Sequence, residues 1–326
     1  MLCIVSPYSN PYFNLASEEY LLKGFQEDVF LLYRNIPSIV VGKHQNTLAE
    51  INLPFVQERE ILVARRISGG GTVFHDQGNL NFAFFTSGKE GELVDYKRAT
   101  RPIIEAMEEM GLDVRLGKRN ELLLNGLKIS GTASHVFKQR VLHHGTLLFS
   151  SEMGNMSAAL KSVQERFTDR AVKSVRSKVT NIRDHLTECM DMEMFQERIL
   201  NHMLQTYDNA KPYHFSETDM KEITALRDSK FSTWEWNFGY SPKYQFCRNI
   251  SFSAGRLELH MNVEKGVIRE LKIEGNFSSQ KDIILLEQML VGTIHDPETI
   301  RMRLSGINLS DYIFGLENEE LISGMF

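Results

Sequence analysis

The sequence predicts an α+β fold with a mixed or antiparallel sheet, followed by a small second domain. Three observations support this prediction. The chain has 326 residues, more than one hydrophobic core usually serves. Its composition, 42% hydrophobic and 24% charged, is typical of a folded globular protein. Helical and strand-like periods alternate irregularly along the chain, which is not the pattern of a regular βαβ series.

Hydrophobic periodicity places the elements of the first part of the chain. Strands are expected within 28–42, 61–86 and 112–149, and helices at 14–25 and 95–110. Asn14 and Asp95 are predicted to cap these two helices, because a short polar side chain can accept a hydrogen bond from the free N–H groups of a first turn. From 151 to 230 the pattern is mainly helical.

A cluster of aromatic, Gly, Ser and Pro residues at 231–242 marks the predicted end of the first domain. Beyond it, the pattern of 248–274 predicts strands with turns at Ala254-Gly255 and Glu264-Lys265-Gly266, and a helix is expected over 279–291. We therefore predict two domains, 1–244 and 245–326, the second a small α+β domain.

Charge and cysteine content exclude several classes of function. With 37 basic and 42 acidic residues the net charge is −5, so the chain as a whole has no positive field for nucleic acid or anionic lipid. Cys3, Cys189 and Cys247 fit neither a disulfide framework nor a CxxC metal site. The sequence shows no signal-peptide pattern and no apolar run of about 18 residues. We expect a cytoplasmic protein without nucleic-acid or membrane partners.

The segment Arg65-Arg-Ile-Ser-Gly-Gly-Gly-Thr-Val-Phe-His75 is the most informative part of the sequence. Three consecutive glycines permit positive φ and close approach of a ligand, and successive N–H groups can converge on an anion. A tight hairpin turn is the alternative for the glycines alone, and the flanking arginines and His75 favour a phosphate site. Neither a P-loop nor a dinucleotide-binding fingerprint matches this segment.

Strand alternation places Asn79 and Asn81 on one face of the strand that follows. Two amides on one face could form the wall of a polar pocket. A buried pair that satisfies its own hydrogen bonds explains the pattern equally well.

The dipeptide Asn125-Gly126 between apolar runs predicts a two-residue hairpin turn. The resulting register pairs Leu123 with Lys128 and Glu121 with Ser130. Lys128 is then either half of an exposed ion pair or a cation directed into a site, and periodicity does not separate the two.

His143 and His144 are adjacent in a predicted strand, so their side chains point to opposite faces. They cannot both bind one metal ion, and a zinc site formed by this pair is not expected. One of them is expected to line a pocket. No Gly-x-Ser-x-Gly motif occurs, so the sequence offers no candidate for a covalent nucleophile.

Four segments together resemble the lipoate-protein ligase A family in order and spacing. They are the glycine segment, Leu127-Lys-Ile-Ser-Gly-Thr-Ala133, His143-His-Gly-Thr-Leu147 and Val175-Arg-Ser-Lys-Val-Thr-Asn-Ile182. Trp234-Glu-Trp-Asn-Phe-Gly239 is similar to the segment that closes the family's catalytic domain. The resemblance implies a biotin/lipoyl-ligase-type catalytic domain with a small C-terminal accessory domain.

The resemblance also implies an activity. The family uses ATP and Mg²⁺ to convert lipoate to lipoyl-AMP, and then transfers the lipoyl group to a lysine of apo lipoyl-domain proteins. The implied acceptors are the acyltransferase subunits of 2-oxoacid dehydrogenases and the glycine cleavage H protein. The C-terminal domain would act as a mobile cover for the adenylation step.

Site residues follow from the matching motif positions. Lys128 is the implied catalytic residue, in contact with the lipoate carbonyl and the α-phosphate, and Asn79 and His144 would contact lipoate. Glu121, where the family often has Asp, is a candidate Mg²⁺ ligand. ATP and lipoyl-AMP are expected at Arg66, Ser68, Gly69, Gly70, Gly71, Thr72, Val73, Phe74, His75 and Lys128.

The main alternative is a lipoyl or octanoyl transferase of the same fold that uses a preformed acyl donor. Its cysteine-dependent form is disfavoured, because none of the three cysteines falls in a motif segment. A biotin ligase would have a different glycine-rich loop, and a non-catalytic carrier-binding protein would not need an intact Lys128. The choice between lipoate and octanoate, the particular acceptors and the oligomeric state stay open.

Overall fold

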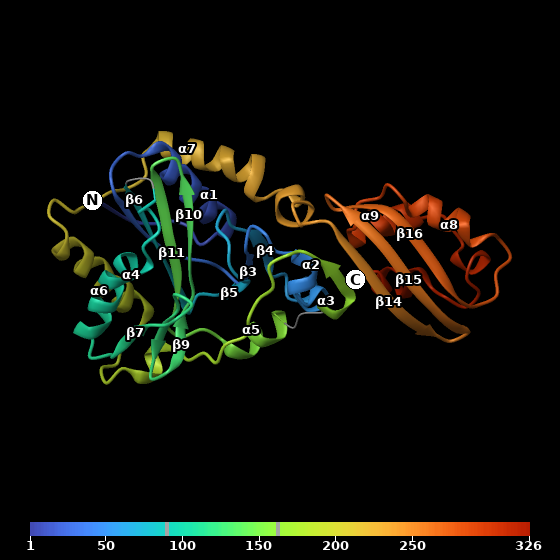
Figure 1. Ribbon diagram of the computed structural model, residues 1–326, viewed down its shortest axis with the longest axis horizontal. Coiled ribbons are helices and arrows are strands. Elements are labelled where there is room, and N and C mark those ends of the chain that lie inside the picture. The colour runs from blue at the N-terminus through green and yellow to red at the C-terminus, as the bar shows by residue number, and fades with distance from the viewer. Residues whose placement is uncertain (89–90, 161–163) are drawn as a thin grey trace. The chain divides into compact units, whose positions relative to one another are not determined.

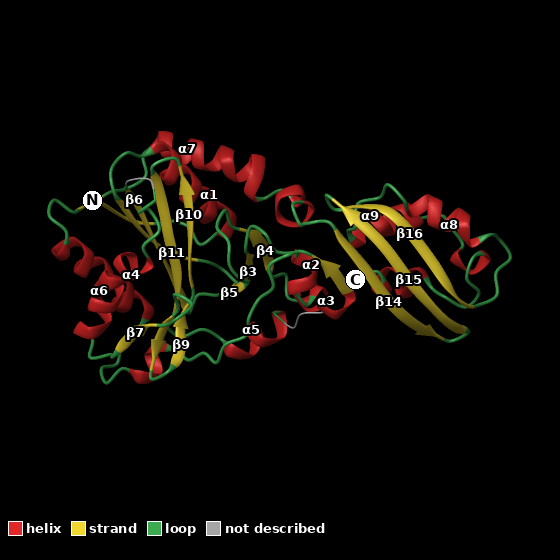
Figure 2. Ribbon diagram, in the orientation of Figure 1, coloured by secondary structure: helices red, strands yellow, loops and turns green. Residues whose placement is uncertain are grey.

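The computed structural model describes residues 1–88, 91–160 and 164–326 (Figure 1). The chain forms two compact units, neither of which is continuous in sequence. Unit 1 comprises Met1–Lys43, Glu58–Leu160 and Ser174–Thr233, and unit 2 comprises His44–Gln57, Lys161–Lys173 and Trp234–Phe326. Helices and mixed sheets occur together, so the predicted α+β class is confirmed (Figure 2).

A six-stranded sheet forms the centre of unit 1. Its strand order is β10-β11-β6-β2-β1-β13. The bounds are β1 Leu2–Val5, β2 Val29–Arg34, β6 Asn79–Ser87, β10 Thr132–Phe137, β11 Arg140–Leu148 and β13 Lys211–Pro212. β1 runs parallel to β2 and β13, whereas β2, β6, β11 and β10 pair antiparallel. The sheet is therefore mixed.

Two three-stranded sheets complete the β-structure of unit 1. One has the order β4-β3-β5 and the other β7-β8-β9. The bounds are β3 Ser38–Val41, β4 Leu62–Arg65, β5 Val73–His75, β7 Val114–Leu116, β8 Leu122–Leu124 and β9 Leu127–Ser130. β4 and β5 flank the glycine segment, and β9 contains Lys128.

Helices pack on the central sheet because its strands are apolar. Phe30 and Phe82 of the sheet belong to one core with Ile103 of α4 and Phe195 of α6. The helix α1 lies toward the other face, where its Glu18 accepts a hydrogen bond from Tyr33 of β2. The helices of unit 1 are α1 Pro11–Gly24, α4 Tyr96–Glu109, α5 Met153–Ala159, α6 Met192–Thr206 and α7 Glu217–Leu226, with short helical turns at Ile182–His185 and Arg227–Phe231.

The predicted cap of the first helix is wrong, and that of the second is confirmed. α1 begins at Pro11, whose fixed φ suits a first helical turn, and Asn10 accepts a hydrogen bond from the Phe13 N–H. Asn14 lies inside the helix, where its amide donates to the Arg34 carbonyl. In α4, Asp95 caps the first turn as predicted.

The hairpin at Asn125-Gly126 forms as predicted, with both turn residues at positive φ. Leu123 pairs with Lys128, but Ser130 pairs with Leu122 rather than with Glu121, because a bulge shifts the register. The predicted Glu121–Ser130 pair is therefore wrong. A bulge inserts one unpaired residue into one strand, and no local pattern in these two short strands marks it.

Unit 2 is built on a four-stranded antiparallel sheet in the order β12-β14-β15-β16. Its strands are β12 Phe167–Asp169, β14 Tyr244–Phe252, β15 Gly255–Glu264 and β16 Val267–Asn276. The hairpins turn at 253–254 and 265–266, within one residue of the predicted turns. In Figure 1, α8 Ile283–Leu290 and α9 Pro297–Leu304 lie behind the three long strands.

The remaining elements of unit 2 are short. They are α2 Thr47–Glu50, α3 Leu53–Glu58, α10 Asn318–Gly324 and helical turns at Gln164–Arg166, Glu235–Gly239 and Leu309–Asp311. Leu48 of α2 and Phe167 of β12 belong to the same core as Leu259 of β15. Among the helices of the described residues, none has both the length and the apolar character needed to span a membrane.

Candidate active site around the glycine loop

The glycine loop closes around the guanidinium of Arg66. Nη2 of Arg66 donates to the carbonyls of Gly69 and Gly71 at 2.6 and 2.7 Å, and Nη1 donates to Val40 at 3.1 Å. Gly70, at φ +89°, needs the left-handed conformation that glycine adopts without strain. Arg66 thus holds the loop from inside, and its predicted direct contact with ATP stays a prediction.

Gly42 forms the floor under this loop. A Cβ at position 42 would lie 2.2 Å from the Gly70 carbonyl oxygen, which is far inside van der Waals contact. Only a glycine leaves room for the loop here. Gly42 was not predicted as a site residue, because a single glycine after a strand has no distinguishing pattern.

The residues after the loop are fixed by neighbouring segments. The Thr72 N–H donates to Oγ of Ser174 at 2.9 Å. Val73, Phe74 and His75 form β5, which pairs antiparallel with β3, and Phe74 is buried in the core. Thr72 and Val73 are partly exposed, so of these residues they are the more accessible to a nucleotide.

A buried chain of hydrogen bonds supports Ser68, next to the loop. Oγ of Ser68 lies 2.6 Å from Nε2 of His144, and Nδ1 of His144 lies 2.8 and 2.9 Å from the two carboxylate oxygens of Glu18. The hydroxyl of Tyr33 also donates to Glu18, at 2.9 Å. Because a carboxylate accepts hydrogen bonds, the geometry suits the tautomer whose Nδ1–H donates to Glu18 and whose Nε2 accepts from Ser68.

Burial and the nearby Glu18 change the pKa values of Tyr33 and Arg66. Burial, and then the charge of Glu18, raise the pKa of Tyr33. Burial lowers the pKa of Arg66 to about 10, and the nearby Glu18 opposes that shift. Glu18 is therefore the buried acid that contacts both Tyr33 and His144, and a buried acid is costly unless it is paired.

Glu18 and Tyr33 were missed in the sequence. Asn14, Ser17 and Glu18 are all buried on α1, at the i, i+3 and i+4 spacing of one helix face. A polar stripe on a helix face that turns toward the core is a signal for a buried polar site. It could have been recognised from the sequence once the helix start was placed correctly.

His75 and Asn79 are also buried beside the site. Burial, followed by the charges of Arg66 and His144, lowers the pKa of His75 to about 3, so its ring is neutral. The Asn35 amide donates to Nδ1 of His75 at 2.9 Å. Within the part of the chain that the structure describes, neither Nε2 of His75 nor Oδ1 of Asn79 has a hydrogen-bond partner.

The two amides of β6 bond mainly to each other. Asn79 donates to Asn81 at 3.0 Å, and Asn81 donates to the Tyr33 carbonyl at 3.2 Å. Oδ1 of Asn79 has no partner among the described residues, so the pair does not satisfy all of its own hydrogen bonds and both interpretations stay open. The predicted contact of Asn79 with lipoate stays a prediction.

The two adjacent histidines point apart, as predicted. His144 contacts Ser68 and Glu18, whereas His143 accepts a hydrogen bond from the Asp95 N–H at 3.2 Å. Burial is the main cause that lowers the pKa of His143 to about 4. His144 alone belongs to the glycine-loop site.

Lys128 is half-buried and is anchored through its backbone. Its N–H donates to the Lys178 carbonyl, and its carbonyl accepts from Thr180. Burial lowers the pKa of its ammonium, with Glu121 opposing and Arg66 adding to the shift. In the described residues Lys128 has no ion-pair partner, which favours a cation directed into a site over an exposed ion pair.

Glu121 provides one carboxylate near Lys128. Its Oε2 accepts from the Arg119 N–H at 2.7 Å. Over residues 1–88, 91–160 and 164–326, no group of three potential metal-binding side chains includes it. Mg²⁺ in nucleotide sites is usually held by one or two carboxylates together with phosphates and water, so a single carboxylate fits that role.

The four sequence motifs converge in unit 1. His144 meets Ser68, and Lys128 is bonded to the 175–182 segment. A Cβ at Gly70 would lie 3.9 Å from Ala133, so the Lys128 segment borders the glycine loop. Residues far apart in sequence therefore lie together in one candidate site, which contains a cationic group, a glycine loop and a buried acid.

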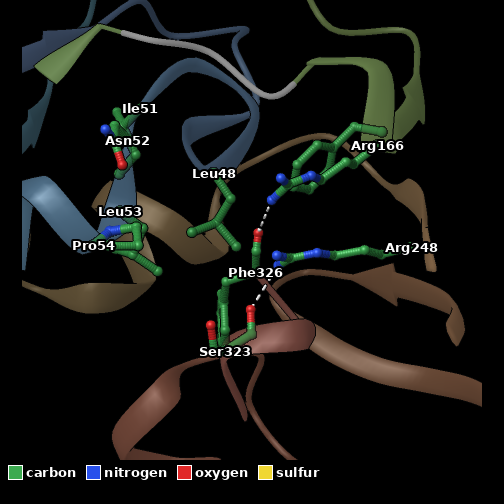
Figure 3. A pocket seen from close by; sticks show the side chains of 10 residues that line it. Leu48, Ile51, Asn52, Leu53, Pro54, Arg166, Arg248, Ser323 and Phe326 are labelled. Carbon is green, nitrogen blue, oxygen red and sulfur yellow. Dashed lines mark hydrogen bonds between the residues drawn. The ribbon is translucent and has the colours of Figure 1, made fainter. Parts of the chain in front are cut away.

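Unit 2 contains a separate pocket of about 230 Å³ (Figure 3). Arg166 and Arg248 lie side by side in it and donate to the carbonyls of Phe326 and Ser323 at 2.9 and 2.6 Å. Its apolar wall includes Leu48. None of the predicted site residues lines this pocket.

Comparison with known proteins identifies the family. Residues 10–204 match the family model of the lipoyl protein ligase A/B catalytic domain, and residues 241–325 match that of the bacterial lipoate protein ligase C-terminus. The chain belongs to the lipoate-protein ligase family. Within it, lipoate-protein ligase LplJ of Bacillus subtilis is 37% identical over 318 residues, 96% of each chain. Lipoate-protein ligase 1 of Staphylococcus aureus is 38% identical over 316 residues, also 96% of each chain.

Solved structures of lipoate-protein ligases have the same fold. A crystal structure of lipoate-protein ligase A bound with ATP covers 73% of this chain and 98% of its own, with a TM-score of 0.62 and 25% identity. Plasmodium falciparum LipL1 in complex with lipoate covers 99% of this chain and 97% of its own, with a TM-score of 0.63 and 24% identity. The predicted family and fold are confirmed.

Proposed function

We propose that this lipoate-protein ligase converts lipoate and ATP to lipoyl-AMP at the glycine-loop site and then transfers the lipoyl group to a lysine of an acceptor protein. The observation that supports this most directly is the convergence of Lys128, the glycine loop and the buried Glu18 in one site of a chain with full-length ligase relatives. The solved structure of a lipoate-protein ligase A with bound ATP and that of LipL1 with lipoate support these two substrates.

In the first step the lipoate carboxylate attacks the α-phosphorus and pyrophosphate leaves. Negative charge builds on the phosphoryl oxygens, so the site must position the reactants and stabilise this charge. We assign the stabilisation to Lys128, whose partial burial leaves its ammonium poorly hydrated and therefore strongly attracted to an anion. The N–H groups of the loop supply further donors.

Mg²⁺ would supply neutralisation of phosphate charge when bound. Glu121 is the residue we propose to hold it.

In the second step, the amine of the acceptor lysine attacks the acyl carbon of lipoyl-AMP and AMP leaves. Lys128 can stabilise the developing charge on the acyl oxygen, so no acyl-enzyme intermediate is required.

The acceptors we propose are apo lipoyl-domain proteins of the cytoplasm, such as acyltransferase subunits of 2-oxoacid dehydrogenases and the glycine cleavage H protein. A structural study of an archaeal lipoylation system pairs a bi-partite ligase of T. acidophilum with its E2 lipoyl domain, which supports this class of acceptor. We also propose that the functional boundary between the catalytic and accessory domains lies near residue 244.

Mass spectrometry tests the proposal directly. The protein is incubated with ATP, Mg²⁺ and lipoate, and lipoyl-AMP is measured before and after an apo lipoyl domain is added. We expect lipoyl-AMP first and a lipoylated lysine second. Transfer only from supplied lipoyl-AMP or another preformed donor, with no ATP-dependent adenylate, would instead identify a transferase of the same fold.

A Lys128 variant then tests the assigned residue. Lys128→Ala should lower both half-reactions by about 10²–10³, because one cation acts on the phosphoryl and the acyl oxygens. Lys221→Ala, which removes an exposed lysine of α7, is the control and should leave both rates unchanged. Wild-type transfer from supplied lipoyl-AMP by the Lys128 variant would contradict the shared role.

A further inference from the structure

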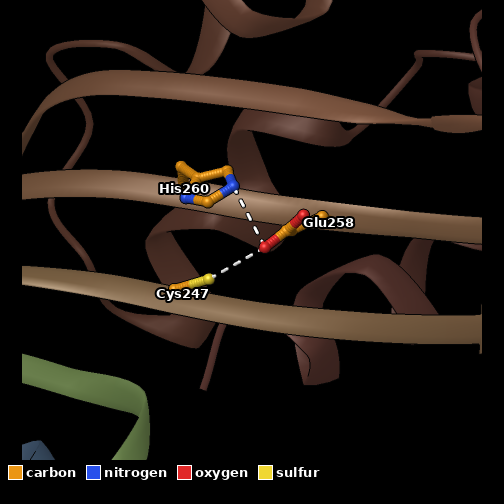
Figure 4. Close-up of side chains that lie close together, drawn as sticks. All are labelled: Cys247, Glu258 and His260. Atoms are coloured by element: carbon orange, nitrogen blue, oxygen red, sulfur yellow. Dashed lines mark hydrogen bonds and ion pairs between the residues drawn. The ribbon is translucent and has the colours of Figure 1, made fainter.

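Three side chains with metal-binding groups meet on the sheet of unit 2 (Figure 4). Cys247 of β14 lies directly opposite His260 of β15, and Glu258 precedes His260 by two residues on the same face. Oε1 of Glu258 lies 3.3 Å from Sγ of Cys247 and 3.3 Å from Nε2 of His260. All three ligand atoms lie within 4.8 Å of one another.

The core of unit 2 fixes this arrangement. Phe246 in β14 and Leu257 and Leu259 in β15 are buried, at 1, 2 and 0% exposure. Since side chains alternate along a strand, their burial turns Cys247, Glu258 and His260 to the opposite, solvent-facing side. A slip of register would expose the core residues, so the three groups are held together by the fold itself.

The distances suit a tetrahedral ion. With Zn–S of about 2.3 Å and Zn–N and Zn–O of about 2.0–2.2 Å, ligand atoms at a tetrahedral centre lie about 3.4–3.6 Å apart. The two distances of 3.3 Å from Glu258 are close to these values. Small rotations of exposed side chains would complete the geometry.

The donor set selects the class of metal. A thiolate and an imidazole favour zinc and similar transition ions over Mg²⁺ or Ca²⁺, which prefer oxygen ligands. A thiolate and a carboxylate together provide two negative charges for a dication. We propose that Cys247, Glu258 and His260 bind a divalent transition-metal ion of the zinc class, with water at the remaining position.

The two charges that face the site from β16 compensate each other. On β16, Lys272 lies opposite His260, and Glu274 lies opposite Glu258. The two form an ion pair of 2.6 Å, so the ammonium of Lys272 is compensated within its own strand. Because a cysteine binds a metal ion as the thiolate, metal binding should release the thiol proton.

Titration of the untagged, full-length protein with Zn²⁺ tests the site, with Co²⁺ as a spectroscopic probe for thiolate ligation. We expect one ion per chain and a thiolate-to-cobalt absorption band. Cys247→Ser and His260→Asn should each weaken binding by at least about tenfold, because loss of even a supporting residue can cost that much. Cys189→Ser, which removes the other exposed cysteine, is the matched control and should bind as the wild type does.

Absence of stoichiometric binding, or binding that Cys247→Ser leaves unchanged, would overturn the proposed site. So would a loss of binding in Cys189→Ser equal to that in Cys247→Ser. Lipoyl-AMP formation with Mg²⁺ alone should be the same in Cys247→Ser and the wild type. The metal site and the proposed ligase activity can thus fail independently of each other.

Discussion

Glu18→Gln tests whether the buried acid organises the glycine loop. The substitution keeps the shape of the side chain and removes its charge. Glu18 is fully buried and accepts from Tyr33 at 2.9 Å and from Nδ1 of His144 at 2.8 and 2.9 Å. Oε1 of Glu18 accepts from both donors, so a glutamine carbonyl in that place would keep both bonds without the charge. The amide NH₂ would then take the place of Oε2, 2.9 Å from Nδ1 of His144, where its N–H would be a buried donor without an acceptor.

The expected cost follows from these contacts. Hydrogen bonds to a charged group contribute about 1.5–3 kcal/mol each, against about 0.5–1.5 kcal/mol for neutral ones, and an unsatisfied buried donor costs about 1–3 kcal/mol. Two bonds weakened by about 1–1.5 kcal/mol each, together with one unpaired donor, give a loss of roughly 3–6 kcal/mol. This is comparable with the cost of breaking a buried ion pair. At about 2–4 °C per kcal/mol it corresponds to a fall in Tm of about 6–24 °C.

Glu18→Gln should also displace the glycine loop and slow the reaction. Glu18 acts through His144 on Ser68, whose Oγ accepts from Nε of Arg66 at 3.0 Å. A displacement of about 1 Å in such a site can lower a rate by about 10². We therefore expect lipoyl-AMP formation to fall by about that factor at a temperature at which circular dichroism shows a folded variant.

Glu108→Gln is the matched control, because it makes the same chemical change at an exposed position of α4. It should change neither Tm nor rate. If Glu18→Gln also melted within about 1 °C of the wild type and formed lipoyl-AMP at the same rate, Glu18 would not be the buried charge that supports the loop.

Three further predictions concern the glycines and pH. Gly70→Val should abolish ATP binding measured by calorimetry. A β-branched residue at φ +89° is strained by about 1–3 kcal/mol, and its Cβ would lie 3.0 Å from Arg66. Unchanged binding in a folded variant would exclude the loop as the nucleotide site. Gly42→Ala should displace the loop and weaken ATP binding. Gly154→Ala is the control and should not weaken it, because a Cβ at that position meets nothing within 4 Å. If both variants bound ATP with the same affinity, the loop would adapt freely to a Cβ at position 42. Burial lowers the pKa of His295 to about 4, against an ordinary value of about 6.5. Between these two pH values the folded state binds fewer protons than the unfolded state does, so the protein loses stability as pH falls from about 6.5 to about 4. Denaturant unfolding at about pH 7.5 and about pH 5 should show roughly 2 kcal/mol less acid destabilisation in His295→Gln than in the wild type, and an identical pH dependence would refute the assignment.

Local patterns predicted the elements whose causes are local. Asn125-Gly126 specifies its turn because both residues tolerate positive φ, and Asp95 caps α4 with its own side chain. The start of α1 was misplaced because Asn10-Pro11 and Asn14 offer competing caps within one turn. The bulge that moves Ser130 opposite Leu122 depends on strand contacts that no local pattern reveals.

The candidate site was predictable only in part. The glycine loop, Lys128 and His144 lie in recognisable motifs, so the sequence could name them. Ser68 is linked to Glu18 through His144, and His144 lies 126 positions from Glu18 in the sequence. This link exists only after α1 packs on the sheet. Likewise, Arg66 was expected at ATP, and its bonds to Gly69 and Gly71 depend on a loop conformation that composition does not specify.

The discontinuity of unit 2 constrains the order in which the protein can fold during its synthesis. Leu48 and Phe167 belong to a core that is completed by residues such as Leu259 and Leu321. The ribosome therefore releases two apolar segments of that core long before their packing partners exist. A nascent chain that has passed unit 1 would keep these segments unpacked, within reach of chaperones and proteases, until the last strands and helices emerge.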